Sequence, residues 1–293
     1  MMKILLLTLL LVSPSWASEL SFRWLGISGF ILSDEKSTIV IDPAFTRVSP
    51  FKYIPGVEVE SDSDEVQYWS ARCQIKSIDA IFVNHAHSDH VIDAPALIKK
   101  FGGKLYGSES TLMIGRGQGL SENQMIKIDP GKTYQVGDFK IEVFHTPHGK
   151  HFGNTVLMDG DITSPLPAKT SAWNYRAGTN MSFFITHPQK TFLFQSVGKV
   201  PDPDVLKDLR PDILLLTIVN RGKGNDFITK RIIPSGAKIV IPLHHDNFLS
   251  KMKREGDMNI LWGMNIDEVQ SDIKKLAPNV KVIWPQYCQE LKF

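Results

Sequence analysis

Short apolar runs separated by polar turns extend along most of this chain. The runs are four to six residues long and rich in β-branched or aromatic side chains, which is typical of strands. In the first half, the predicted strands are residues 22–25, 29–32, 38–41, 78–83, 104–107 and 139–144. An apolar helical face in residues 94–101, with Asp93 as its cap, follows the strand at 78–83. This alternation predicts α/β layering.

The second half continues the alternation of strands and helices. Residues 182–186 and 191–195 predict a hairpin, and His187 in its turn is expected to be solvated. Further predicted elements are strands at 212–217, 238–242 and 280–284 and helices at 227–233 and 267–276. No repeat, linker or low-complexity segment in the sequence demands a second domain, so residues 18–293 are expected to form one domain.

Two stretches interrupt this pattern. Residues 45–76 show little periodicity and predict a long surface loop, which in enzymes is a common place for functional residues. Residues 160–178 are irregular and carry Trp173 and Tyr175, which either line a substrate rim or pack as loop anchors.

The composition narrows the class of protein. With 293 residues, of which 42% are hydrophobic and 22% charged, the chain is long enough for one large α/β domain. The formal net charge of +2 is close to neutral and argues against bulk electrostatic capture of nucleic acid or of an anionic membrane. Partners must therefore be inferred from local features.

The amino-terminal residues 1–17 differ from the rest of the chain. Lys3 precedes an apolar run over residues 4–12, and Ser15-Trp16-Ala17 then forms a small-x-small cleavage pattern. These features predict a signal peptide and hence a periplasmic or secreted protein. The apolar run is shorter than the about 20 residues that cross a bilayer, so no stable membrane span is expected.

Cys73 and Cys288 are the only cysteines in the sequence. An exported chain meets an oxidising compartment, in which these two could form one disulfide. Two buried free thiols and, less favoured, a thiolate metal ligand are the alternatives.

Three imidazoles and a carboxylate occupy six consecutive residues, His85-Ala86-His87-Ser88-Asp89-His90, directly after a predicted strand. Functional sites tend to lie at such strand ends. His85 and His87 are two residues apart, so in an extended segment they project to the same side and can hold one cation. Asp89 and His90 point elsewhere and suit a second, neighbouring metal. Zinc is the expected ion because it accepts nitrogen and oxygen ligands.

Two further histidine clusters end predicted strands. His145, His148 and His151 follow the strand at 139–144, and His148 is favoured as a ligand of the first metal, whereas His145 could face the core. His244 follows the strand at 238–242 as part of a histidine pair.

Three other polar residues are candidates for supporting roles. Asp42 ends a predicted strand and is interpreted as a group that supports a metal ligand rather than as a cap. Arg221 and Lys223 lie among glycines after an apolar strand and either bind a phosphate or carboxylate group of the substrate or form a solvated basic turn.

With these residues considered together, the chain resembles the metallo-β-lactamase superfamily, in particular its lactonase-like and phosphodiesterase-like branch. The resemblance implies a four-layer αβ/βα sandwich with a dinuclear metal site at one edge. The motifs that carry it occur in the family's order and are Trp24-Leu25-Gly26, Asp42-Pro43, the run from His85 to His90, the His148 region and Pro242-Leu243-His244.

The same resemblance implies a ligand set. It assigns His85, His87 and His148 to the first metal, and Asp89, His90 and His244 to the second. Two such cations can share a water and lower its pKa towards about 7, and Asp89 would orient the resulting hydroxide.

One position departs from the family pattern. Where members usually carry a bridging aspartate after the strand at 191–195, this chain has Val197, which cannot bind a metal. Asp161 is a possible substitute. The cofactor is therefore expected to be one or two zinc ions, or another divalent transition metal.

The predicted function is an exported hydrolase that uses zinc-bound hydroxide on an ester, lactone, amide or phosphodiester bond. With this function, the expected partner is a small-molecule substrate. The alternative, suggested by Val197, is a non-catalytic periplasmic protein that binds a metal or ligand with a degenerate dinuclear site.

Overall fold

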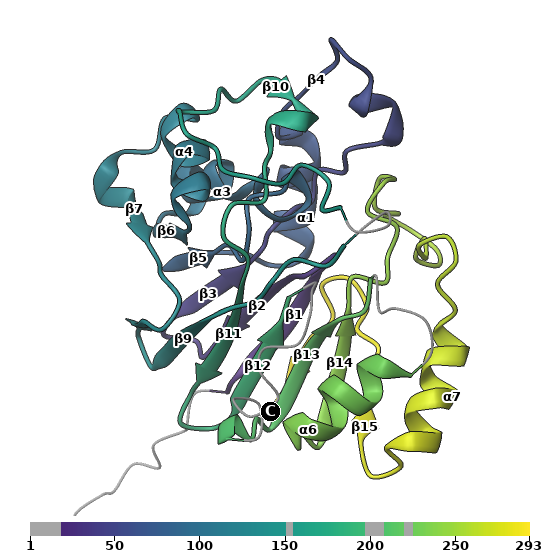
Figure 1. The fold of residues 1–293 in the computed structure, drawn as a ribbon. Coiled ribbons are helices and arrows are strands. Elements are labelled where there is room, and N and C mark those ends of the chain that lie inside the picture. The colour runs from purple at the N-terminus through teal and green to yellow at the C-terminus, as the bar shows by residue number, and fades with distance from the viewer. Residues whose placement is uncertain (1–18, 151–154, 197–207, 220–224) are drawn as a thin grey trace, which may run out of the picture.

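Two seven-stranded sheets face each other, and helices cover the outer side of each sheet (Figure 1). The computed structural model describes residues 19–150, 155–196, 208–219 and 225–293. The arrangement is the predicted four-layer αβ/βα sandwich. A small two-stranded sheet, β4 (Glu58–Val59) with β10 (Thr170–Ser171), lies above the helices of the first half.

The first sheet has the strand order β16-β1-β2-β3-β5-β6-β7. Its first four strands in this order pair antiparallel, and β3, β5, β6 and β7 pair parallel. The carboxyl ends of the parallel strands therefore lie at one edge. The strands are β1 (Ser21–Gly26), β2 (Gly29–Ser33), β3 (Thr38–Ile41), β5 (Ala80–Phe82), β6 (Lys104–Gly107), β7 (Met125–Lys127) and β16 (Glu290–Lys292).

The second sheet has the strand order β15-β14-β13-β12-β11-β9-β8. The strands from β12 to β15 pair parallel, and β11 pairs antiparallel with both β9 and β12. As a result β9 and β14 point the same way. The strands are β8 (Thr133–Val136), β9 (Phe139–His145), β11 (Met181–Thr186), β12 (Thr191–Gln195), β13 (Ile213–Thr217), β14 (Ile239–Leu243) and β15 (Lys281–Val282).

The alternation of side chains along the strands builds the layers. In β2, Phe30 and Leu32 point between the sheets, where Phe30 meets Phe194 of the second sheet, whereas Ile31 points to the outer helices. The helices over the first sheet are α1 (Ser63–Arg72), α2 (Ser88–Val91), α3 (Ala94–Phe101) and α4 (Glu109–Gly117). Over the second sheet lie the π-helical turn η4 (Ile228–Ile232), α6 (Ile233–Ser235) and α7 (Ile266–Leu276).

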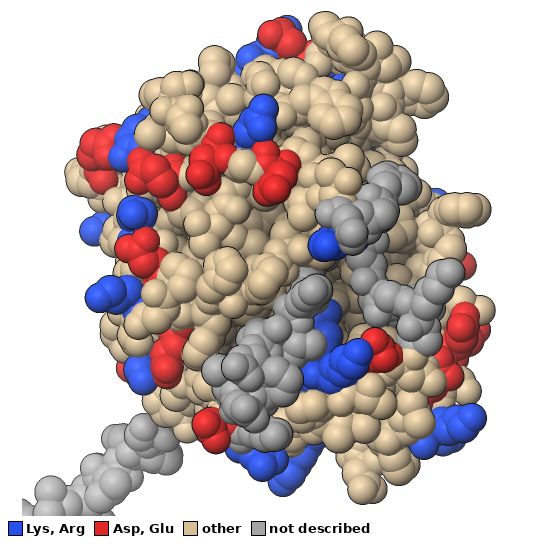
Figure 2. Space-filling view, viewed as in Figure 1, with Lys and Arg blue, Asp and Glu red and all other residues tan. Residues whose placement is uncertain are grey.

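Charged side chains of both signs lie on the surface (Figure 2), in line with the nearly neutral net charge of the sequence. On the face shown in Figure 2, both acidic and basic side chains occur, with several acidic side chains in a row at the upper left and several basic ones along the lower edge. Within the described residues, no helix is both long and apolar enough to cross a membrane.

The prediction that residues 45–76 form a surface loop is wrong in its second half, because α1 lies there. Asp62 caps this helix by accepting hydrogen bonds from the backbone of Asp64 and Glu65. Val66 and Trp69 are buried, and Trp69 Nε1 donates to Glu65 Oε2 over 3.0 Å. Most of the other residues of α1 are polar, which obscures its periodicity in the sequence.

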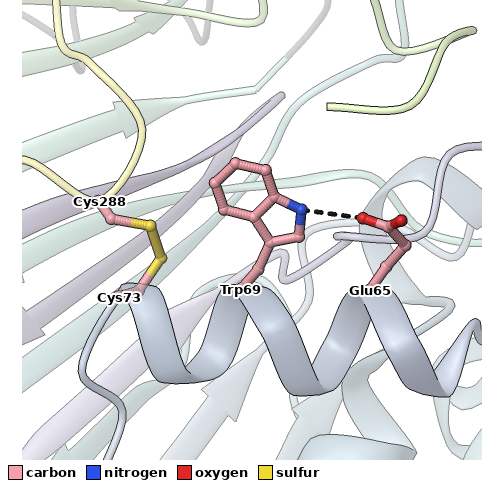
Figure 3. The surroundings of a disulfide bond; sticks show 4 residues. All are labelled: Glu65, Trp69, Cys73 and Cys288. Atoms are coloured by element: carbon pink, nitrogen blue, oxygen red, sulfur yellow. Dashed lines mark hydrogen bonds between the residues drawn. A yellow bond between two sulfur atoms is a disulfide. The ribbon is translucent and has the colours of Figure 1, made fainter. Parts of the chain in front are cut away.

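Cys73, at the end of α1, forms a disulfide with Cys288 (Figure 3). The two Cα atoms are 4.6 Å apart although 215 positions separate the residues in sequence. The free-thiol and metal-thiolate alternatives are therefore excluded. The bridge ties the helical layer to the segment that leads into β16.

Two smaller predictions are also wrong. His187 is not solvated: it is 5% exposed, and its Nε2 lies 3.4 Å from Asp34 Oδ2 in the neighbouring β2–β3 turn. The strand predicted at 280–284 shortens to β15, and the last strand is instead β16, which pairs with β1. Both errors come from contacts with segments that are distant in sequence.

Candidate metal centre

The predicted histidine clusters meet where strands of both sheets end. His85 follows β5 of the first sheet, whereas His148 and His244 follow β9 and β14 of the second. The structure brings the six predicted ligands together as two groups, and the rings of His85 and His90 join them with a centroid distance of 4.0 Å. The groups are His85, His87 and His148, and Asp89, His90 and His244.

Three ring nitrogens converge in the first group. His85 Nε2 lies 3.0 Å from His87 Nδ1 and 3.2 Å from His148 Nε2. With Zn–N distances of about 2.0–2.1 Å, tetrahedral geometry places nitrogen ligands about 3.3 Å apart. The spacing therefore suits three ligands around one cation.

The other ring nitrogen of each of these histidines faces an oxygen acceptor and therefore carries the proton. The nitrogen that points towards the other two histidines then has a free lone pair. The acceptors are Asn84 Oδ1 for His85, the Met158 carbonyl for His87 at 3.3 Å, and the Gly149 carbonyl for His148 at 2.7 Å. This donor set fits a metal, since three inward lone pairs would otherwise repel one another.

A hydrogen-bond chain that the sequence analysis missed supports His85. Asn84 Nδ2 donates to Ser196 Oγ over 2.7 Å, and Ser196 Oγ donates to Asn180 Oδ1 over 2.8 Å. Ser196 follows β12, directly before Val197. The strand end that lacks the family's aspartate thus supports the first group from behind. No local sequence signal links these three residues.

The second group contains one carboxylate and two imidazoles. Asp89 Oδ2 lies 3.4 Å from His90 Nε2 and 3.5 Å from His244 Nε2. His90 Nδ1 donates to Asp42 Oδ2 over 2.9 Å, which places Asp42 in the predicted supporting position. The opposite nitrogen of His244, Nδ1, is buried without a hydrogen-bond partner among the described residues.

The two groups differ in their electrostatics. Burial lowers the pKa of His85 well below its usual value, and neighbouring imidazoles lower it further. The ring is therefore neutral and can offer a lone pair to a metal. Burial also opposes protonation of His90, but the charges of Asp89 and Asp42 outweigh it and raise the pKa of His90 to about 10. Burial raises the pKa of Asp89, yet His90 and His244 hold it well below its usual range. Asp89 is therefore ionised.

Two aromatic residues stand at the rim of the second group. Tyr53 ends the 3₁₀ helix η1 (Pro50–Tyr53), and burial together with the charge of Asp89 raises its pKa to about 12. Trp173, in the 3₁₀ helix η3 (Ala172–Asn174), is 46% exposed, and its ring meets that of Tyr53 edge to face. Tyr175 is fully buried and packs as a loop anchor.

Several predicted residues do not join the centre. Asp161 is exposed and accepts a hydrogen bond from Ser110 Oγ over 3.4 Å, outside both groups, so it does not replace the missing aspartate. His145 ends β9 as an exposed residue and does not face the core. The predictions for His151, Val197, Arg221 and Lys223 lie outside the described residues.

Comparison with known proteins places this geometry in a family. The model of the beta-lactamase superfamily domain matches residues 21–244. A metal-dependent hydrolase of Myxococcus xanthus is 26% identical over 216 residues, which cover 73% of this chain and 68% of the relative. One of Methanobrevibacter smithii is 28% identical over 237 residues, with 78% and 83% covered.

A solved structure agrees with the fold. The isothiocyanate hydrolase from Delia radicum gut bacteria superposes with a TM-score of 0.60 at 15% identity, covering 93% of this chain and 99% of that chain. At this identity the likeness shows the fold alone. The match of the family model over most of the chain, together with the two converging ligand groups, shows that this protein belongs to the metallo-β-lactamase superfamily.

Proposed function

We propose that this protein is a metal-dependent hydrolase that cleaves an ester, lactone, amide or phosphodiester bond of a small-molecule substrate. Family membership and the description of the relatives as metal-dependent hydrolases support the general activity. The observation that carries the proposal is the pair of ligand groups, joined by the neighbouring rings of His85 and His90.

The residues around the centre suit hydrolysis. A divalent cation held there would polarise a substrate oxygen and lower the pKa of a water. The ionised Asp89 carboxylate would orient the attacking water, since Asp89 keeps 24% of its side chain exposed while its histidine neighbours are buried. His90 is held in place by Asp42, so that its Nε2 faces Asp89.

Zinc is the proposed ion. Five of the six ligand atoms are imidazole nitrogens and the sixth is a carboxylate oxygen, a set that suits zinc better than magnesium or calcium. One or two ions are proposed, with the first group the stronger site.

The test combines metal analysis with four chromogenic or spectroscopic probes. Purified protein is supplemented with zinc, its metal content is measured by mass spectrometry, and hydrolysis is assayed with p-nitrophenyl acetate, dihydrocoumarin, nitrocefin and bis(p-nitrophenyl) phosphate. We expect stoichiometric metal and turnover of at least one probe that chelation abolishes and zinc restores. Protein that binds metal but hydrolyses none of the probes would support the non-catalytic binding alternative.

Export is the proposed localisation, with residues 1–17 as the signal peptide and residues 18–293 as one domain. The Cys73–Cys288 disulfide supports it, because such bonds persist in oxidising compartments. Mass spectrometry of protein from cell fractions tests it: a mature amino terminus near Ser18 in the periplasm or medium is expected. Uncleaved protein confined to the cytoplasm would contradict it.

A further inference from the structure

A phenol at the rim of the metal centre has no role in the predicted ligand set. Tyr53 belongs to η1, in the segment before α1. Its hydroxyl faces Ser88 and lies within the field of the Asp89 carboxylate. Asp89 is the partly exposed member of the second group, so Tyr53 lies beside the ligand of that group that solvent reaches.

The hydroxyl of Ser88 is a second polar group at this position, and it faces Tyr53. Ser88 is 1% exposed, and its Oγ lacks a hydrogen-bond partner at ordinary distance among the described residues. A buried polar group without a partner is costly, and functional sites are where such groups are retained. The polar group that faces it is the Tyr53 hydroxyl.

Trp173 holds Tyr53 in this position. The indole Nε1 of Trp173 donates to the Tyr53 carbonyl oxygen over 2.8 Å, and the two rings meet edge to face with centroids 5.7 Å apart. Two short helices from distant parts of the chain, η1 and η3, thus fix the phenol from both its backbone and its ring. A position held in this way suits a group that must meet a substrate atom without reorganisation.

We propose that Tyr53 is a catalytic residue, and that its phenolic O–H donates a hydrogen bond to the substrate oxygen that gains negative charge during hydrolysis. A phenol is a donor at neutral pH, whereas the ionised Asp89 can only accept, so the two groups serve different atoms. This inference rests on the proposed hydrolase function and deepens it, since it requires a substrate whose reacting carbonyl or phosphoryl oxygen faces η1.

The decisive variant is Tyr53→Phe, which removes one oxygen and keeps the ring packing. With whichever of the four probes the wild type hydrolyses, we expect kcat to fall about 10- to 100-fold, as for loss of one transition-state donor. KM should change little, and metal content and Tm should match those of the wild type. Trp173→Phe, which loses the bond to the Tyr53 carbonyl but keeps a ring, should lower kcat by a smaller factor.

Tyr68→Phe is the matched control. Tyr68 is a partly buried tyrosine on α1 that packs under Arg254, away from the six ligands, and its variant should keep wild-type kcat. A Tyr53→Phe variant with kcat within twofold of the wild type would overturn the inference and leave the hydrolase proposal standing. A wild type without metal-dependent turnover would overturn both. If Tyr53→Phe failed to fold, unchanged kcat in Trp173→Phe would count against the inference.

Discussion

The two ligand groups of this centre are supported in different ways. The first consists of three histidines whose outer nitrogens face neutral oxygens: a side-chain amide and two backbone carbonyls. The second contains the charged Asp89, and a second carboxylate, Asp42, lies beneath His90. One group is therefore held by neutral dipoles and the other by charges. The difference suggests that the first group is ready for a metal at neutral pH, whereas the second must first lose a proton.

Removing a ligand of the first group should have the largest effect. In His87→Ala we expect kcat to fall at least about 1,000-fold, because one of three ligands is lost and the remaining nitrogens no longer enclose the ion. The measurement is activity together with metal content. His145→Ala is the control, since His145 is exposed at the end of β9. Full metal content in His87→Ala would contradict the assignment.

Replacing the supporting carboxylate of the second group should have the next largest effect. Asp42→Asn keeps the shape but removes the charge that orients His90, so the affinity for a second metal should fall about 10- to 100-fold. The first metal should remain. Competition with a chromophoric chelator measures both affinities, and Asp161→Asn, an exposed carboxylate outside both groups, serves as control. Equal weakening of both metals would remove the distinction between the groups.

The affinities of the two ligand groups for metal should depend differently on pH. The pKa of His90 is raised to about 10 in the metal-free protein, so a metal must displace a proton there throughout the range from pH 6 to 9. Affinity of the second site should therefore rise about tenfold per pH unit. The pKa of His85 is lowered, so its ring is already neutral and the first site should change less. Parallel slopes in calorimetry would refute this difference.

Restoring the family's aspartate should strengthen the weaker group. Val197→Asp places a carboxylate at the position where members of the family usually carry one, and we expect the second metal to bind about tenfold more tightly. Val197→Asn adds polarity without charge and is the matched control. If both variants bound metal like the wild type, the weakness of the second group would have another origin.

Loss of the disulfide should have the smallest effect on the site, and only on the second group. Tyr287, beside Cys288, donates to Asp246 Oδ2 over 2.9 Å, and Asp246 lies two residues after His244. The Cys73→Ser/Cys288→Ser variant should lose about 2–5 kcal/mol of unfolding free energy. Its second-site affinity should fall only a few-fold, and the first site should not change. Equilibrium unfolding and chelator competition measure these quantities.

Local signals in the sequence predicted the α/β layering and the histidine clusters, whereas the four-layer sandwich and the full set of six ligands followed from the resemblance to the metallo-β-lactamase superfamily. Short apolar segments in the sequence predict the strands. The segment from His85 to His90 places four candidate ligands directly after one of these strands. The supporting contacts leave no such signal. The chain from Asn84 through Ser196 to Asn180 and the pairing of Tyr53 with Trp173 each join segments far apart in sequence, and only the folded backbone brings them together. The buried state of His187 escaped prediction for the same reason.

The bridge between Cys73 and Cys288 also determines what happens to this protein when its backbone is cut. All six predicted ligands, from His85 to His244, lie inside the covalent ring that the bridge closes. A single cleavage anywhere in that ring leaves two pieces that remain one molecule, with every ligand still attached. A protease that nicks a surface loop would therefore linearise the ring without releasing any part of the metal centre, and the two pieces would separate only under reducing conditions.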